Sequence, residues 1–300
     1  SIVNGAPIYL EKNAVKQDIL LSSVRKYYYL DIGKNEYGDI TVDYIRGSGY
    51  IYAKIVDKLE GEDIFDPDCV GMYQFPKTKG DSINYETYLK KIVISPIDTE
   101  KCTNGCYILI TVVNSVNEKE EIIDGDSKLT PYRFTITPRI FPAIGDDEEY
   151  SSYLVPRIKM SINQFVIGNV YKTGNQILTY YRVNLPYDSE YVIFDWQADK
   201  PSLFIDIEDE RPGILPEEHL FSFESIGHDT VYRLKKSEIL ERIEEKYGEK
   251  KENLTNLELV LGIWTDELDT LYTSMYAFKI MMPRKNEDYD VSLNEIIHIR

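Results

Sequence analysis

A pattern of alternating apolar residues occurs twice in this chain, and the repetition limits the available folds more than any other feature. The two copies cover residues 27–55 and 180–207. Alternation with a period of two is typical of strands that bury one face. The residues expected on the buried face of the first strand align at one constant offset, Ile40, Val42 and Tyr44 with Val192, Phe194 and Trp196.

A turn follows that strand in both copies, and a second alternating run follows the turn. The turn is Gly47-Ser48-Gly49 in the first copy and Asp199-Lys200-Pro201 in the second. Two alternating runs joined by a short turn predict a β-hairpin in each copy. The apolar residues of the second runs also align, Ile51, Ala53 and Ile55 with Leu203, Ile205 and Ile207.

The correspondence continues on both sides of these runs. Residues 106–113 align with 257–264, and residues 132–136 align with 276–280. Further matches near the start of each copy are Ile8, Leu10 and Asn13 with Ile158, Met160 and Asn163. Matches that recur in the same order predict a tandem duplication. The predicted organisation is a first domain over residues 1–139, a linker over 140–152, a second domain over 153–284 and a strand-like tail over 285–300.

The second copy contains the one convincing helix signal. Ser237 can act as the N-cap, and Gly248 can end the helix. The apolar face between them comprises Ile239, Leu240 and Ile243. Short strands separated by Gly, Pro and Asn-Gly turns account for the rest of the chain. The sequence therefore predicts an all-β chain of two tandem antiparallel β-sandwich domains, with one short helix inserted in the second.

The order of strand signals in each copy resembles that of the pre-peptidase C-terminal (PPC-like) domain, a small jelly-roll sandwich. In the first copy the signals are YYYLDI, then GDITVDYIRGSGYIYAKI, then CYILITVV and YRFTI. The resemblance implies modules of secreted proteins that act as non-catalytic accessory, adhesive or carbohydrate-contacting units, some with acidic loops that hold calcium. The chain departs from that arrangement because no attached catalytic domain is recognisable, which favours a structural role.

The charge of the chain argues against two classes of partner. Its formal net charge is −17, whereas nucleic-acid binding depends mainly on Lys and Arg contacts to phosphate. An anionic membrane surface is disfavoured for the same reason. No stretch approaches the roughly 20 apolar residues of a membrane-spanning helix. We therefore expect other proteins, including further copies of this chain, or glycans as partners.

The sequence offers no catalytic constellation, so we expect neither an enzyme nor a cofactor. The histidines His219, His228 and His298 suggest no triad. Gly47-Ser48-Gly49 joins two strands and is not the strand-to-helix elbow of a serine hydrolase. One acidic loop can donate oxygen ligands to calcium, although a solvated loop is the favoured interpretation. Its candidate ligands are Glu62, Asp63, Asp66 and Asp68.

Cysteine usage and one short motif point to an extracellular or cell-surface location. A disulfide in the first copy would either join Cys69 to Cys102 or Cys106, or close the small loop between the latter two. The spacing lacks the paired Cys-x-x-Cys of a zinc ribbon. Asn253 begins an N-glycosylation sequon in a polar loop.

Strand-like apolar residues occur near both ends of the chain. They are Ile2, Val3 and Ile8 at the start and Val291, Leu293, Ile297 and Ile299 at the end. Such segments suit strand exchange, in which one protomer completes the sheet of the next and builds a filament. The sequence thus favours a non-enzymatic extracellular structural protein that self-associates as a fibre, filament or coat subunit. The alternatives are a glycan- or calcium-dependent adhesion module and accessory domains of a secreted hydrolase.

Overall fold

The fold is given by a computed structural model. It describes residues 7–20, 25–46, 49–59, 73–75, 89–114, 132–143, 155–170, 179–198, 200–224, 230–265 and 275–284. Within these ranges the chain is almost entirely β, with four sheets and a single α-helix. The predicted all-β class is confirmed. We call residues 7–143 the first half and residues 155–284 the second half.

The first half contains two sheets that face each other. One has the strand order β1-β3-β8-β5-β6 and the other the order β2-β9-β4-β7. The strands of the first sheet are β1 (Ile8–Tyr9), β3 (Arg25–Ile32), β8 (Cys106–Asn114), β5 (Gly49–Val56) and β6 (Tyr73–Phe75). Those of the second are β2 (Lys16–Leu20), β9 (Tyr132–Phe141), β4 (Tyr37–Arg46) and β7 (Leu89–Ile94).

The second half also contains two facing sheets. Their strand orders are β10-β12-β17-β14-β15 and β11-β18-β13-β16. The strands of the first are β10 (Arg157–Met160), β12 (Thr179–Asn184), β17 (Glu258–Trp264), β14 (Ser202–Ile207) and β15 (Phe221–Phe223). Those of the second are β11 (Phe165–Asn169), β18 (Met275–Met281), β13 (Tyr191–Ala198) and β16 (Thr230–Lys235). A 3-10 turn, Pro216–Glu218, precedes β15.

Both halves arrange their strands in the same order, since each strand number of the first half plus nine gives the equivalent strand of the second. The short parallel pair of β1 with β3 recurs as β10 with β12. Asn13 and Asn163, which the sequence aligns, both adopt the left-handed backbone conformation, with φ of 56° and 62°. Asparagine tolerates this conformation better than most residues do.

The predicted hairpins are wrong. β4 pairs with β7 and β9, whereas β5 pairs with β6 and β8 in the opposite sheet. The equivalent strands β13 and β14 also lie in different sheets. Alternation identifies a strand with one buried face, but it does not specify the neighbouring strand. The two alternating runs of each copy are therefore consecutive strands that belong to different sheets.

The apolar residues of the alternating runs fill two separate cores. Ile40, Val42 and Ile51 lie in the core of the first half, and Phe194, Trp196 and Leu203 lie in that of the second. Within each half, the side chains that face inward come from both sheets. This is the packing expected of a β-sandwich.

The helix is present, but it begins two residues earlier than expected. α1 spans Lys236–Tyr247 with Lys235 at its N-cap position, so Ser237 lies inside the first turn. The backbone N–H of Lys235 donates to the Glu238 carboxylate at 3.2 Å. Gly248 ends the helix in the left-handed conformation with φ of 69°, as glycine readily does. The predicted apolar face is confirmed by the buried Ile239 and Ile243 and the partly buried Leu240.

The predicted start of the linker also needs correction. β9 continues to Phe141, and Ile140 contributes to the first core. Residues 140 and 141 therefore belong to the last strand of the first half. The Pro-containing composition suggested an earlier end, but the backbone of Ile140 pairs with Gly38 on β4.

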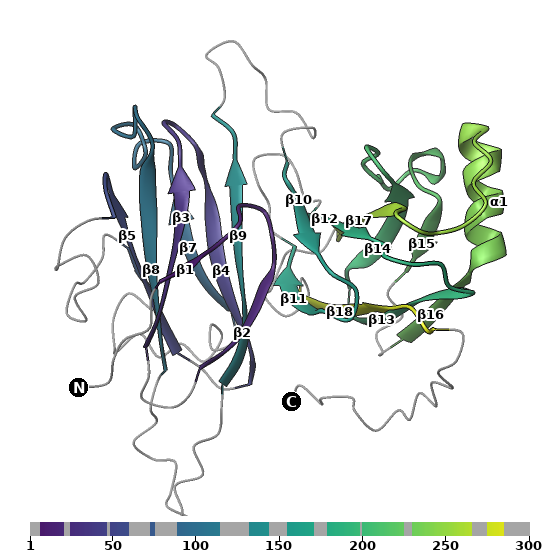
Figure 1. The fold of residues 1–300 in the computed structure, drawn as a ribbon, viewed down its shortest axis with the longest axis horizontal. Coiled ribbons are helices and arrows are strands. Elements are labelled where there is room, and N and C mark those ends of the chain that lie inside the picture. Colours follow the sequence, from purple (N-terminus) through teal and green to yellow (C-terminus); the bar gives the residue numbers. More distant parts are fainter. Residues whose placement is uncertain are drawn as a thin grey trace, which may run out of the picture.

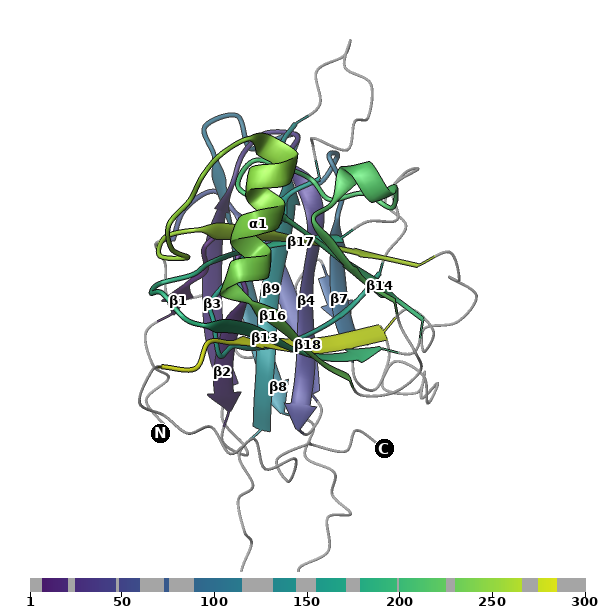
Figure 2. The same cartoon turned by 90° about the vertical axis from the view of Figure 1, so that its right-hand side faces the viewer.

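The two halves meet through unlike surfaces. In Figure 1 the flat sheet with β9 and β4 stands beside the end of the second sandwich, where β10, β11, β12 and β18 lie. Figure 2 shows that β13 and β18 run across the direction of β4 and β9. Helix α1 lies on the side of the second half that is remote from the first.

Candidate functional site

The outward face of the β4–β9 sheet carries polar side chains that are nevertheless buried. Because Ile40 and Val42 point into the core, alternation directs Asp39, Thr41 and Asp43 outward. Such a face is usually wet. Here all three side chains are buried, and Asp43 is only 2% exposed. Their neighbours across the pairing with β9 are also buried, namely Thr135, Thr137 and Arg139.

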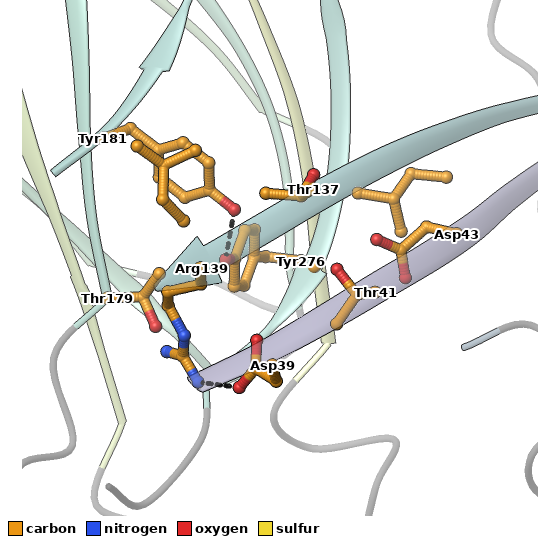
Figure 3. Close-up of a pocket in the computed structure, with 11 residues that line it drawn as sticks. Asp39, Thr41, Asp43, Thr137, Arg139, Thr179, Tyr181 and Tyr276 are labelled. Atoms are coloured by element: carbon orange, nitrogen blue, oxygen red, sulfur yellow. Dashed lines mark hydrogen bonds and ion pairs between the residues drawn. The ribbon is translucent and has the colours of Figure 1, made fainter. Parts of the chain in front are cut away.

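The second half covers this face and leaves one small cavity at the contact. The cavity has a volume of about 20 Å³, which is close to the roughly 10–15 Å³ that one water molecule needs. Figure 3 shows Tyr181 and Tyr276 of the second half among the polar side chains of β4 and β9. The second half lines it with Ile158, Ile167, Gly168, Thr179, Tyr181 and Tyr276.

A buried ion pair occupies one side of the contact. The Arg139 guanidinium lies 2.5 Å from the Asp39 carboxylate, and the two residues are directly opposite in the β4–β9 pairing. The Lys91 ammonium approaches the same carboxylate to 4.0 Å. Burial lowers the pKa of Lys91, opposed by the Asp39 charge. Two cations therefore converge on Asp39.

Asp43 lacks such compensation. Its Oδ1 has no hydrogen-bond partner among the described residues, and the hydroxyl of Thr135, directly opposite in register, also lacks one. Burial raises the pKa of Asp43 well above its ordinary value, and the nearby Asp39 charge adds to the effect. A buried carboxylate without a counter-ion takes up a proton when it can. The contact thus favours the protonated form of Asp43.

Tyr181 and Tyr276 line the cavity from the second half and are held in place by their neighbours. The hydroxyls of Tyr181 and Tyr276 hydrogen-bond to each other at 2.8 Å, and the Tyr276 ring stacks on Trp196. Burial raises the pKa of Tyr181, so its hydroxyl stays neutral. A side chain at position 168 would place a Cβ 2.5 Å from the Tyr276 hydroxyl oxygen. Glycine at that position lets the tyrosine reach the contact.

Backbone hydrogen bonds also join the halves beside the cavity. The Val15 N–H donates to the Lys159 carbonyl at 2.9 Å, and the Lys159 N–H donates to the Asn13 carbonyl at 2.6 Å. They flank a parallel bridge between Ala14 and Lys159. Val15 packs into the core of the second half. The first half therefore contributes a residue to the second core as well as a flat face.

The chemistry of this site is that of a contact between domains. The cavity has room for no more than a water-sized group, and burial raises the pKa of both Tyr181 and Asp43. In the described ranges, no group of three or more His, Cys, Asp or Glu side chains could hold a metal ion. What the face does in this structure is bind another sandwich.

The structure pairs Cys102 with Cys106, with their Cα atoms 5.2 Å apart. Both cysteines lie in the first core. Cys69 and the candidate calcium ligands Glu62, Asp63, Asp66 and Asp68 lie outside the described residues. Asn253 is exposed in a turn, where its side-chain oxygen accepts the Thr255 N–H at 3.0 Å. Its side chain is therefore accessible for modification.

The described residues include one candidate for strand exchange, Ile8. It pairs in parallel with Tyr28 of its own half and packs against the first core. In this structure Ile8 is thus paired within its own chain, and strand exchange between protomers stays a prediction. The remaining candidates, Ile2, Val3, Val291, Leu293, Ile297 and Ile299, lie outside the described residues.

Comparisons with known proteins yield no family. No family model matches the chain, and no curated protein matches it. Solved structures similar to this chain include the CUB1-EGF-CUB2 domains of human MASP-1/3, at 7% identity and a TM-score of 0.20, covering 88% of this chain and 99% of that chain. The same domains of rat MASP-1 match at 7% identity and a TM-score of 0.19, covering 91% and 100%.

No helix in the described ranges has the length and apolar character needed to cross a bilayer. The contact between the halves was missed by sequence reasoning. Its one signal is the acidic and hydroxyl residues that alternate with Ile40 and Val42, and the same pattern describes a face in water. Nothing local distinguishes a wet polar face from one that a second domain covers.

Proposed function

We propose that this chain is a non-enzymatic extracellular structural protein that self-associates head to tail. The observation that carries the proposal is the contact between the halves, in which the flat face of one sandwich binds the end of another. A contact between unlike surfaces can be repeated without closing on itself, and each repetition adds a subunit.

The extracellular location draws support from two features. The Cys102–Cys106 disulfide is of a kind that persists mainly in oxidising compartments. The exposed Asn253 stands in a sequon that secreted proteins use for glycosylation. The acidic net charge of −17 would limit nonspecific association.

Sedimentation velocity over a wide range of protein concentration tests the proposal. We expect a series of species larger than a dimer that grows with concentration, because an open contact sets no final size. A single monomer peak at all concentrations would overturn self-association, and the alternative of a glycan-dependent adhesion module would then be tested by binding to a glycan array.

A further inference from the structure

The second half carries a face equivalent to the one that is buried in the first half. On the β13–β18 sheet, the sequence aligns Tyr191, Ile193 and Asp195 with Asp39, Thr41 and Asp43. The strand register agrees, because Asp43 is opposite Thr135 while Asp195 is opposite Lys279. The second half therefore presents, in the same position of the same fold, a second face of this kind.

This second face is accessible at its margins, whereas its counterpart is covered throughout; its central residue Ile193, the counterpart of Thr41, is only 6% exposed. Tyr191 and Val231 are both 38% exposed, whereas Asp39 and Asp43 are almost fully buried. Arg233 and Lys235 on β16 are exposed beside them. The face thus combines apolar side chains with a small group of cations on a chain that is strongly acidic overall.

The first half has an end equivalent to the end that docks in the second half. Ile167 lines the contact cavity, and Ile19 holds the same place in the sheet, since the two lie opposite the aligned residues Ala277 and Arg133. Lys159, which forms the backbone bridge, aligns with Tyr9. Ile19 is 45% exposed and Tyr9 is 52% exposed.

We propose that the β13–β16 face of one copy binds the β1–β2 end of the next copy, as the β4–β9 face binds the second half within the chain. This inference rests on the proposed self-association and names its surfaces. The occupant is a second copy of this chain, because the chain itself contains both partners of such a contact and buries one example of it.

Side-chain chemistry is consistent with this pairing. Val15 inserts into the core of the second half. On the second face, Phe165 is a half-buried apolar residue of β11 that lies opposite Lys279. At the docking end of the first half, the Asp31 carboxylate is 55% exposed with Lys12 at 3.4 Å, whereas Glu11 already pairs with Lys159 within the chain. Asp31 can approach Arg233 and Lys235, so association should weaken as salt is added.

The test uses one charge-introducing variant on each surface and a matched control. Ile19→Glu alters the docking end, Val231→Glu alters the face, and Ile97→Glu makes the same isoleucine change as the first at a residue that is 80% exposed and on neither surface. In sedimentation velocity we expect the first two variants to need at least about tenfold more protein for half-assembly, since an unpaired charge at a contact costs more than about 1.4 kcal/mol. The control should assemble like the wild type.

Mixing the two defective variants gives the decisive result. Ile19→Glu keeps an intact face and Val231→Glu keeps an intact docking end, so an equimolar mixture should form dimers and stop. Unimpaired assembly of both variants, while the wild type assembles, would overturn these surfaces and leave self-association standing. A monomeric wild type would instead overturn the function itself. If either variant unfolds, Ile19→Gln and Tyr191→Glu replace it under the same two criteria.

Discussion

The two halves differ in the segment that links two equivalent pairs of consecutive strands. In the first half, residues 95–105 link β7 to β8 and are tied by the Cys102–Cys106 disulfide within the core. In the second half, residues 236–257 link β16 to β17 and include helix α1, which buries Ile239 and Ile243. A covalent bond and a packed helix thus close equivalent ends of two sandwiches.

The halves also differ in the face of the sheet that docks. The first half buries an ion pair and a neutral carboxyl group there, whereas the second half exposes Tyr191 and Val231 with cations nearby. Breaking a buried ion pair is strongly destabilising, so we expect the contact within the chain to be fixed. We propose that the equivalent face of the second half makes a reversible contact.

Removal of the guanidinium at position 139 should have the largest effect on stability. Arg139→Met leaves Asp39 buried with only Lys91 nearby, at 4.0 Å, and breaking a buried pair costs about 3–5 kcal/mol. Urea denaturation measures the loss. Arg133→Met, an exposed arginine of the same strand, should change stability by less than about 0.5 kcal/mol. Equal losses in both variants would show that Asp39 does not depend on its partner.

Truncation of Ile243 tests how much the packing of α1 stabilises the second half. Ile243→Ala removes a fully buried side chain, and such changes cost about 2–5 kcal/mol. The measurement is again the free energy of unfolding in urea. Glu241→Ala, on the exposed side of α1, serves as the control and should be nearly neutral. A negligible loss in Ile243→Ala would mean that the helix only covers the surface.

Reduction of the Cys102–Cys106 disulfide tests how much this bond stabilises the first half. The closed loop is short, with a sequence separation of 4, and the loop-closure model gives about 2 kcal/mol for a loop of this size. The free energy of unfolding should fall by this amount when a reductant is added. A Cys102→Ala/Cys106→Ala variant should show no response to reductant, and any response there would locate the effect at another thiol.

The pH dependence of stability should report on Asp43. Because burial raises the pKa of Asp43, the folded state keeps a proton that the unfolded chain releases above the ordinary carboxyl range. Below the pKa of Asp43 in the unfolded chain, this residue does not lower the free energy of unfolding. As the pH rises from there to the folded pKa, the free energy of unfolding falls by about 1.4 kcal/mol per pH unit. Asp43→Asn should therefore be more stable than the wild type near pH 7 and equal to it near pH 3. Parallel pH profiles would contradict a neutral Asp43.

Particular residues show what the sequence could and could not predict. The core positions of the alternating runs, such as Ile40 and Phe194, followed from period two because burial of one face leaves a local signature. The hairpins failed because pairing is set by the whole sandwich. The buried Asp39, Asp43 and Arg139 carry no local signature of their burial, since the residues that cover them belong to the second half and are distant in sequence. The repeat itself, however, pointed to the equivalent face of the second half.

Electron microscopy of the negatively stained wild-type chain tests head-to-tail self-association most directly. We expect unbranched filaments whose axial repeat equals the length of one two-sandwich chain, because every copy offers one docking end and one open face. Closed dimers of a fixed size, or uniform monomers at every concentration, would contradict association through unlike surfaces.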